Sequence, residues 1–242
     1  MSEAAGEGAG PGVTEHHVEV PRTARYYTVG DRGTARAVWV ALHGYGQLAG
    51  YFARHFAAHA AGRLVVAPEA LSRFYVARES GPAEGGAAGE PARVGATWMT
   101  REDRLAEIAD YVRYLDRALD SAAAGLDIAP DSLGVLGFSQ GAATAARWLA
   151  HRHRRGLAVP GRTVIWGGAL PPDLDLAGAD GEALRATRLT LVVGERDEFA
   201  TAAGVAEQEA RLAAAGVAYA LVRYAGGHRL DGATLGRVLG GA

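Results

Sequence analysis

Short apolar runs rich in β-branched residues alternate along this chain with longer amphipathic stretches. That alternation is typical of a mostly parallel sheet with helices on both faces. The first two runs precede any helix, so we expect them to pair antiparallel through a turn at Pro21–Ala24. The pattern predicts strands at His17–Val20, Arg25–Val29, Ala37–Leu42, Leu64–Ala67, Leu133–Gly137, Thr163–Trp166, Leu189–Val193 and Ala218–Tyr224.

The clearest helix is expected at Arg101–Leu119, where apolar residues recur at steps of three and four and make one apolar face. Thr100 is a suitable cap for its start. Further helices are predicted at Ala49–Ala61, Ala142–Arg154, Thr201–Ala215 and Gly232–Leu239.

Two segments depart from this alternation of apolar runs and amphipathic stretches. Residues 1–12 consist mostly of Gly, Ala and Glu, without the basic start and apolar core of a signal peptide, and are predicted to be a disordered tail. Glu79–Pro91 is rich in Gly, Pro and Glu and is predicted to be a loop. It lies within an insert at 72–99 that is either a short lid or a tolerated surface insertion. The rest, 13–242, is expected to be one domain.

The composition narrows the possible functions. The 242 residues are 49% hydrophobic, enough for a sizeable core, and the net charge of −2 gives no general attraction to nucleic acid. Lysine and cysteine are absent, which excludes Schiff-base lysines, Walker lysines, thiol nucleophiles and cysteine metal sites. No apolar run approaches the length of a membrane span. The lack of cysteine agrees with a cytoplasmic location without requiring it.

Gly137-Phe138-Ser139-Gln140-Gly141 is a G-x-S-x-G pentapeptide with a predicted strand before it and a predicted helix after it. A serine on such a tight strand-to-helix turn is exposed for nucleophilic attack, and small flanking residues allow the turn. A serine hydroxyl needs a base to take its proton and an acid to orient that base. The pentapeptide therefore predicts Ser139 as a nucleophile.

The base and the acid are expected downstream, after later strands. His228 lies in a glycine loop behind the last strand, whereas His151 and His153 belong to a basic run at a helix end, where positive charge suits the helix dipole. Among the acids after the strand at Leu189–Val193, which include Glu195 and Glu198, Asp197 is favoured, because it lies past the strand end, where a loop side chain can point back over the carboxyl edge of the sheet.

Backbone N–H groups are needed to hold the negative charge that develops on the substrate oxygen. One is expected from Gln140, the residue after the nucleophile. The other is expected from Tyr45, because the glycines on both sides of it in His43-Gly44-Tyr45-Gly46 leave that backbone free to turn.

These motifs resemble the phospholipase/carboxylesterase family of α/β hydrolases, which includes small bacterial carboxylesterases and acyl-protein thioesterases. The resemblance rests on four elements in the family's order: His43-Gly44-Tyr45-Gly46, Gly137-Phe138-Ser139-Gln140-Gly141, Gly194-Glu195-Arg196-Asp197 and Gly227-His228. It implies a cofactor-free serine hydrolase of esters or thioesters with Ser139, Asp197 and His228 as its triad. Two departures stand out: Gln47 replaces the family's usual aspartate, and Met99-Thr100 follow Trp98 where an aromatic and an acid are usual.

Phe74, Tyr75, Trp98 and Met99 flank the Gly-rich loop and either line a substrate pocket or pack on the sheet edge. His55 and His59 lack the glutamate of an H-E-x-x-H site, so no metal is expected. The sequence thus predicts an α/β hydrolase acting on small or medium acyl esters. A thioesterase, a lysophospholipase, a peptidase and an inactive binding protein with the same fold remain alternatives, and a homodimer is an option that the sequence leaves open.

Overall fold

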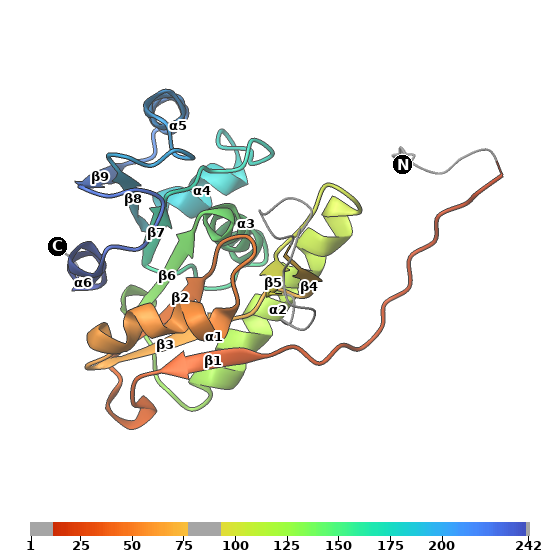
Figure 1. The fold of residues 1–242 in the computed structure, drawn as a ribbon, viewed down its shortest axis with the longest axis horizontal. Coiled ribbons are helices and arrows are strands. Elements are labelled where there is room, and N and C mark those ends of the chain that lie inside the picture. The colour runs from red at the N-terminus through yellow and green to blue at the C-terminus, as the bar shows by residue number, and fades with distance from the viewer. Residues whose placement is uncertain (1–11, 77–92, 241–242) are drawn as a thin grey trace, which may run out of the picture.

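A computed structural model describes residues 12–76 and 93–240. Its main sheet has seven strands in the order β1-β3-β2-β6-β7-β8-β9 (Figure 1). Only β1 is antiparallel to its neighbour. The strands are β1 (Tyr26–Val29), β2 (Ala37–Leu42), β3 (Arg63–Pro68), β6 (Leu133–Phe138), β7 (Arg162–Trp166), β8 (Arg188–Gly194) and β9 (Tyr219–Tyr224).

Helices cover both faces of the sheet, as expected (Figure 1). Strand β2 belongs to both hydrophobic cores, because its alternate side chains point to opposite faces of the sheet. Val38, Val40 and Leu42 face α2 and α3, whereas Trp39 and Ala41 face α1 and α6. The helices are α1 (Ala49–Phe52), α2 (Arg104–Ala123), α3 (Gln140–Arg154), α4 (Ala179–Arg185), α5 (Ala202–Ala214) and α6 (Gly232–Gly240).

A second, two-stranded sheet lies beside the main one. Strands β4 (Ser72–Tyr75) and β5 (Val94–Thr97) pair antiparallel and enclose the predicted loop, whose residues 79–91 lie outside the described ranges. The pattern did not indicate either strand, because both are only four residues long and β4 is half-exposed to exposed. They matter because β5 contacts the loop that follows β2, described below.

Three expectations about elements are wrong. His17–Val20 is unpaired and Val18 is 82% exposed, because the segment lies beside α2, where Glu19 contacts Arg113, instead of along β1. The main sheet therefore has seven strands instead of eight, and β1 pairs with β3 rather than with an earlier strand. The helix expected at Ala49–Ala61 is one turn of α1 followed by 3-10 helix at Ala53–His59.

The predicted tail, 1–12, lies outside the described residues except for Gly12. Within the described ranges, none of the helices combines the length and the apolar character that crossing a bilayer requires.

Candidate active site

The candidate residues gather at the carboxyl edge of the main sheet. Ser139 follows β6, Asp197 follows β8, His228 follows β9, and the loop 43–47 follows β2. Parallel strands end at the same edge, so loops that are far apart in sequence meet there (Figure 1). This edge is where α/β proteins generally place their sites.

Ser139 occupies a strained backbone conformation, with φ 55° and ψ −117°. The turn also requires the flanking glycines: a Cβ on Gly137 would lie 2.1 Å from the Gly141 oxygen, and one on Gly141 would lie 2.2 Å from the Leu42 oxygen. A hydrogen bond from the Ser139 N–H to the Trp166 oxygen (2.8 Å) ties the turn to β7. Strain of this kind persists only where the surrounding structure holds it, and it is common at functional sites.

The Ser139 side chain is hydrogen-bonded into a chain of three polar groups. Its Oγ lies 2.9 Å from Nε2 of His228, and Nδ1 of the same ring lies 2.9 and 3.0 Å from the two carboxylate oxygens of Asp197. Because the carboxylate only accepts, Nδ1 carries a proton and Nε2 of the neutral ring is left to accept from the serine hydroxyl.

Asp197 is held in place by the backbone. Its Oδ1 accepts hydrogen bonds from the N–H groups of Phe199 and Ala200 at 2.9 and 3.0 Å, and its side chain is fully buried. Glu195 and Glu198, the competing acids, are exposed. The imidazole of His228 packs on two aromatic rings, Phe138 at 4.8 Å and Phe199 at 4.6 Å between ring centroids. The Phe199 side chain is 77% exposed, so it borders the site on the solvent side.

In the loop after β2, three of four successive N–H groups have acceptors. The Gly44 N–H donates to Oε1 of Gln47 (2.9 Å), the Gly46 N–H to the Ala96 oxygen (2.9 Å), and the Gln47 N–H to the Gly44 oxygen (3.3 Å). The Tyr45 N–H has no acceptor among the described residues. The loop is also adjacent to the serine, because a Cβ on Gly44 would lie 3.1 Å from the Ser139 Cβ.

Gln140 supplies a second N–H beside Ser139. It is the first residue of α3, so its N–H has no partner within the helix. Its side chain is bound to the end of β5 and the residues that follow: Nε2 donates to Oγ1 of Thr97 (2.8 Å) and to the Met99 oxygen (2.9 Å), and Oε1 accepts from the Trp98 N–H (3.1 Å). Sequence reasoning considered only the backbone of Gln140 and missed these contacts.

The family model for FSH1 serine hydrolases matches residues 39–230, which contain all of these groups. The chain belongs to the FSH1 serine hydrolase family. A search of curated proteins gives no match.

Solved structures with the α/β-hydrolase fold also resemble the chain. Acyl-protein thioesterase 2 of Zea mays is 20% identical over 90% of this chain and 97% of its own (TM-score 0.64). A carboxylesterase of Mesorhizobium loti is 19% identical over 90% and 95% (TM-score 0.62). One of Bacillus cereus is 16% identical over 90% and 92% (TM-score 0.62). The expected resemblance to phospholipases and carboxylesterases is thereby confirmed.

In this FSH1 family member, a buried histidine and a tryptophan support the loop after β2. His43 is fully buried, and its Nε2 accepts from the Ala70 N–H (3.1 Å), which leaves the proton on Nδ1 to donate to the Gly44 oxygen (2.8 Å). The indole N–H of Trp98 donates to the His43 oxygen (2.8 Å). Burial lowers the pKa of His43 below its ordinary value, which keeps the ring neutral and its donor in place.

The four residues considered for a substrate pocket, three aromatic residues and Met99, lie in different surroundings. Phe74 packs on Tyr45, with 5.0 Å between ring centroids, and Tyr75 is 75% exposed. The sulfur of Met99 lies 3.4 Å from Nη1 of Arg147. Trp98 is 1% exposed and belongs to the core, so it does not face a substrate.

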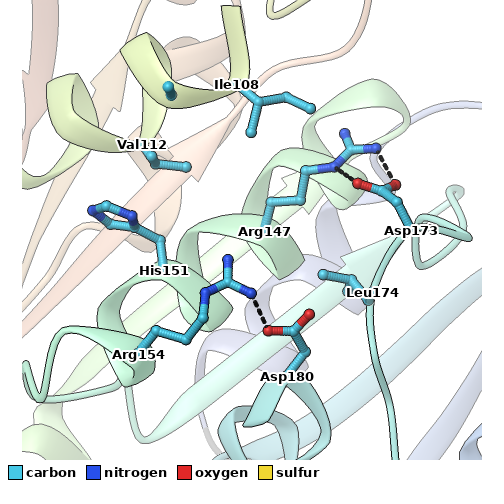
Figure 2. A pocket seen from close by; sticks show the side chains of 9 residues that line it. Ile108, Val112, Arg147, His151, Arg154, Asp173, Leu174 and Asp180 are labelled. Atoms are coloured by element: carbon cyan, nitrogen blue, oxygen red, sulfur yellow. Dashed lines mark hydrogen bonds and ion pairs between the residues drawn. The ribbon is translucent and has the colours of Figure 1, made fainter. Parts of the chain in front are cut away.

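A cavity of about 270 Å³ lies further along α3, between α2 and α4 (Figure 2). Arg147 in its wall is eight residues beyond Ser139, about 12 Å along the helix. Arg147 pairs with Asp173, and Arg154 with Asp180, so these charges are neutralised within the wall. In the basic run at the end of α3, Arg152, His153 and Arg154 each contact an acid of a neighbouring element. We assign this cavity no role in the chemistry at Ser139.

Proposed function

We propose that this protein is a carboxylesterase that cleaves small or medium acyl esters through an acyl-enzyme on Ser139. The observation that carries the proposal is the unbroken hydrogen-bonded chain from Ser139 Oγ through His228 to Asp197. A serine, an imidazole and a buried carboxylate in this order form a triad for nucleophilic acyl transfer. The FSH1 family membership supports the same class of reaction.

In the first step, Nε2 of His228 takes the Ser139 proton as Oγ attacks the ester carbonyl carbon. The carbonyl oxygen becomes an anion, which the Tyr45 and Gln140 N–H groups stabilise. When the intermediate collapses, the C–O bond to the alcohol breaks and His228 gives its proton to the leaving oxygen. Asp197 stabilises the imidazolium while it exists and holds the ring in the required tautomer.

In the second step, water replaces the alcohol. His228 takes a proton from the water, the hydroxide attacks the acyl carbon, and the same N–H groups hold the second anion. Collapse releases the carboxylic acid, and the proton on His228 returns to Ser139. No metal or cofactor takes part in either step.

The aromatic borders of the site favour an apolar acyl group. Phe199 lies beside His228, and Phe74 packs on Tyr45, whose side chain is itself largely exposed. Exposed aromatic side chains can bury an acyl chain when a substrate binds. Thioesters and lysophospholipids offer the same carbonyl carbon, so the residues at the reaction centre leave both as alternative substrates.

The test is a panel of p-nitrophenyl esters from acetate to octanoate with matched thioesters, measured on the wild-type protein and on Ser139→Ala. We expect turnover that peaks at a short or medium chain and is lost in Ser139→Ala. His228→Gln should lose it as well, while circular dichroism of both variants stays native. Near-normal turnover in Ser139→Ala, or no turnover of any ester or thioester by the wild type, would overturn the proposal; the second outcome favours a binding protein that kept the fold.

A further inference from the structure

A row of residues crosses four strands near the opposite, amino-terminal edge of the main sheet. The strand register aligns Trp39 of β2 with Gly134 of β6, Gly134 with Arg162 of β7, and Arg162 with Arg188 of β8. Residues aligned in this way project from the same face of a sheet. Trp39, Arg162 and Arg188 are therefore neighbours on the face that α6 covers.

Gly134 makes room for the tryptophan to lie across the row. A Cβ at this position would lie 2.7 Å from Cδ2 and Cε3 of the indole. The ring thus extends over β6 towards β7, and the guanidinium carbon of Arg162 lies 4.8 Å above its centroid. Stacking on an indole fixes the plane of a guanidinium group without using any of its N–H donors.

The row forms one wall of a cavity of about 370 Å³. Val164 and Thr190, the next residues on the same face of their strands, extend this wall, and Val238 and Gly240 of α6 also line the cavity. Two buried donors in the wall have no acceptor among the described residues: Nε1 of Trp39 and Nε of Arg162. Buried N–H groups without partners are costly and uncommon in proteins.

The charge around this cavity is positive. Arg162 and Arg188 are directly opposite on adjacent strands, an arrangement that like charges make unfavourable. Burial, with Arg188 and Arg63 nearby, lowers the pKa of Arg162. The acid that faces them is Asp131, whose Oδ1 lies 3.9 Å from Nη2 of Arg188. One Arg162 donor, Nη1, is used by the Leu239 oxygen (3.2 Å).

We infer that this cavity binds a small oxyanion, a carboxylate or phosphate group held between the guanidinium groups of Arg162 and Arg188. Such a group offsets the repulsion between the two arginines. The planar guanidinium fork matches carboxylate and phosphate geometry. The site is separate from the proposed function, because it lies at the other edge of the sheet from Ser139 and shares no residue with it.

The test is a titration followed by the indole N–H signals in a proton–nitrogen correlation spectrum. The Trp39 signal is assigned from its loss in Trp39→Phe. Sodium butyrate and sodium phosphate are titrated in separate arms, with sodium chloride holding ionic strength constant. We expect the Trp39 signal to shift saturably in at least one arm and not with chloride alone, and the arm that saturates identifies the group.

Three variants make the result specific. Arg162→Gln and Arg188→Gln should each raise the dissociation constant about tenfold or more, because each removes charge-assisted hydrogen bonds. Arg188 is 69% exposed at its side chain, so its variant is expected to fold even if Arg162→Gln does not. Arg117→Gln on α2 removes the same charge from the opposite face and should bind as the wild type does. The inference is overturned if Trp39 shows no saturable shift in either arm, or if Arg188→Gln binds as tightly as the wild type.

Discussion

Oε1 of Gln47 accepts a hydrogen bond from the Gly44 N–H at 2.9 Å and so closes the loop that carries Tyr45. The backbone of Gln47 also pairs with Ala96 of β5, in an isolated antiparallel bridge. The aspartate that is usual here in the phospholipase/carboxylesterase family would offer a carboxylate oxygen as the acceptor. The neutral amide of Gln47 offers one too, so the departure from the family pattern keeps the loop braced.

Gln47→Ala should lower kcat for p-nitrophenyl butyrate about tenfold with little change in KM. The variant leaves the Gly44 N–H without its acceptor, at a cost of about 1–3 kcal/mol, and loosens the donor at Tyr45. Gln47→Glu keeps an oxygen at the same place and should retain most of the activity. Equal kcat in Gln47→Ala and the wild type would show that this brace is not needed.

Tyr45 is expected to act through its backbone alone. Tyr45→Ala keeps the N–H and removes a side chain that is 61% exposed, so kcat should stay within about twofold of the wild type. Tyr45→Pro removes the N–H, and kcat should fall about 10²-fold, the usual effect of losing one oxyanion donor. Thermal unfolding of both variants checks that the loop still docks on β5. A Tyr45→Pro enzyme with normal kcat contradicts the assignment.

Gly167 leaves space for the imidazole and the carboxylate to meet. With φ 57°, it follows β7, and a Cβ there would lie 3.1 Å from Oδ2 of Asp197 and 3.2 Å from Nδ1 of His228. Gly167→Ala should therefore lower kcat/KM at least tenfold. Gly156→Ala is the matched control, because Gly156 has a similar φ of 65° with no atom near the added Cβ. Both should lose about 1–2 kcal/mol of stability to backbone strain, but only Gly167→Ala should lose activity.

Stability should fall as the pH drops below 6.5, because burial lowers the pKa of His43 in the folded protein. The unfolded chain therefore takes up a proton at a higher pH than the folded one. The contribution of His43 to stability is full above pH 6.5 and declines as the pH falls towards the pKa of His43 in the folded protein. The decline is at most about 1.4 kcal/mol per pH unit for one group.

Urea unfolding between pH 4.5 and 6.5 measures this decline. His43→Gln should flatten it. Burial also lowers the pKa of His151, so His151→Gln is measured separately and should remove a smaller part. An unchanged slope in His43→Gln would assign the pH dependence to other groups.

Much of the candidate site could be predicted because it is local in sequence. The strand before Ser139, the small residues beside it and the helix after it all lie within one short stretch, and Asp197 and His228 each follow an apolar run. The contacts that support the site are not local. Gln140 reaches Thr97 and Met99, and His43 reaches Ala70, across tens of residues that no periodic pattern connects.

The strand error at His17–Val20 has the same origin. Alternating polar and apolar residues are compatible with a strand, but a strand forms only where an edge is free to pair with it. Here the segment lies beside α2, with Glu19 against Arg113, and the outer edge of β1 stays unpaired. The row of Trp39, Gly134, Arg162 and Arg188 was also missed, since only the strand register brings these four positions together.

The proposed reaction requires Ser139 to be a nucleophile that His228 activates. Labelling with a fluorophosphonate probe, followed by peptide mass spectrometry, measures this activation. We expect one adduct, on Ser139, and its loss in Ser139→Ala and strong reduction in His228→Gln. Labelling that persists unchanged in Ser139→Ala, or a native wild-type protein that takes no label, would contradict the account.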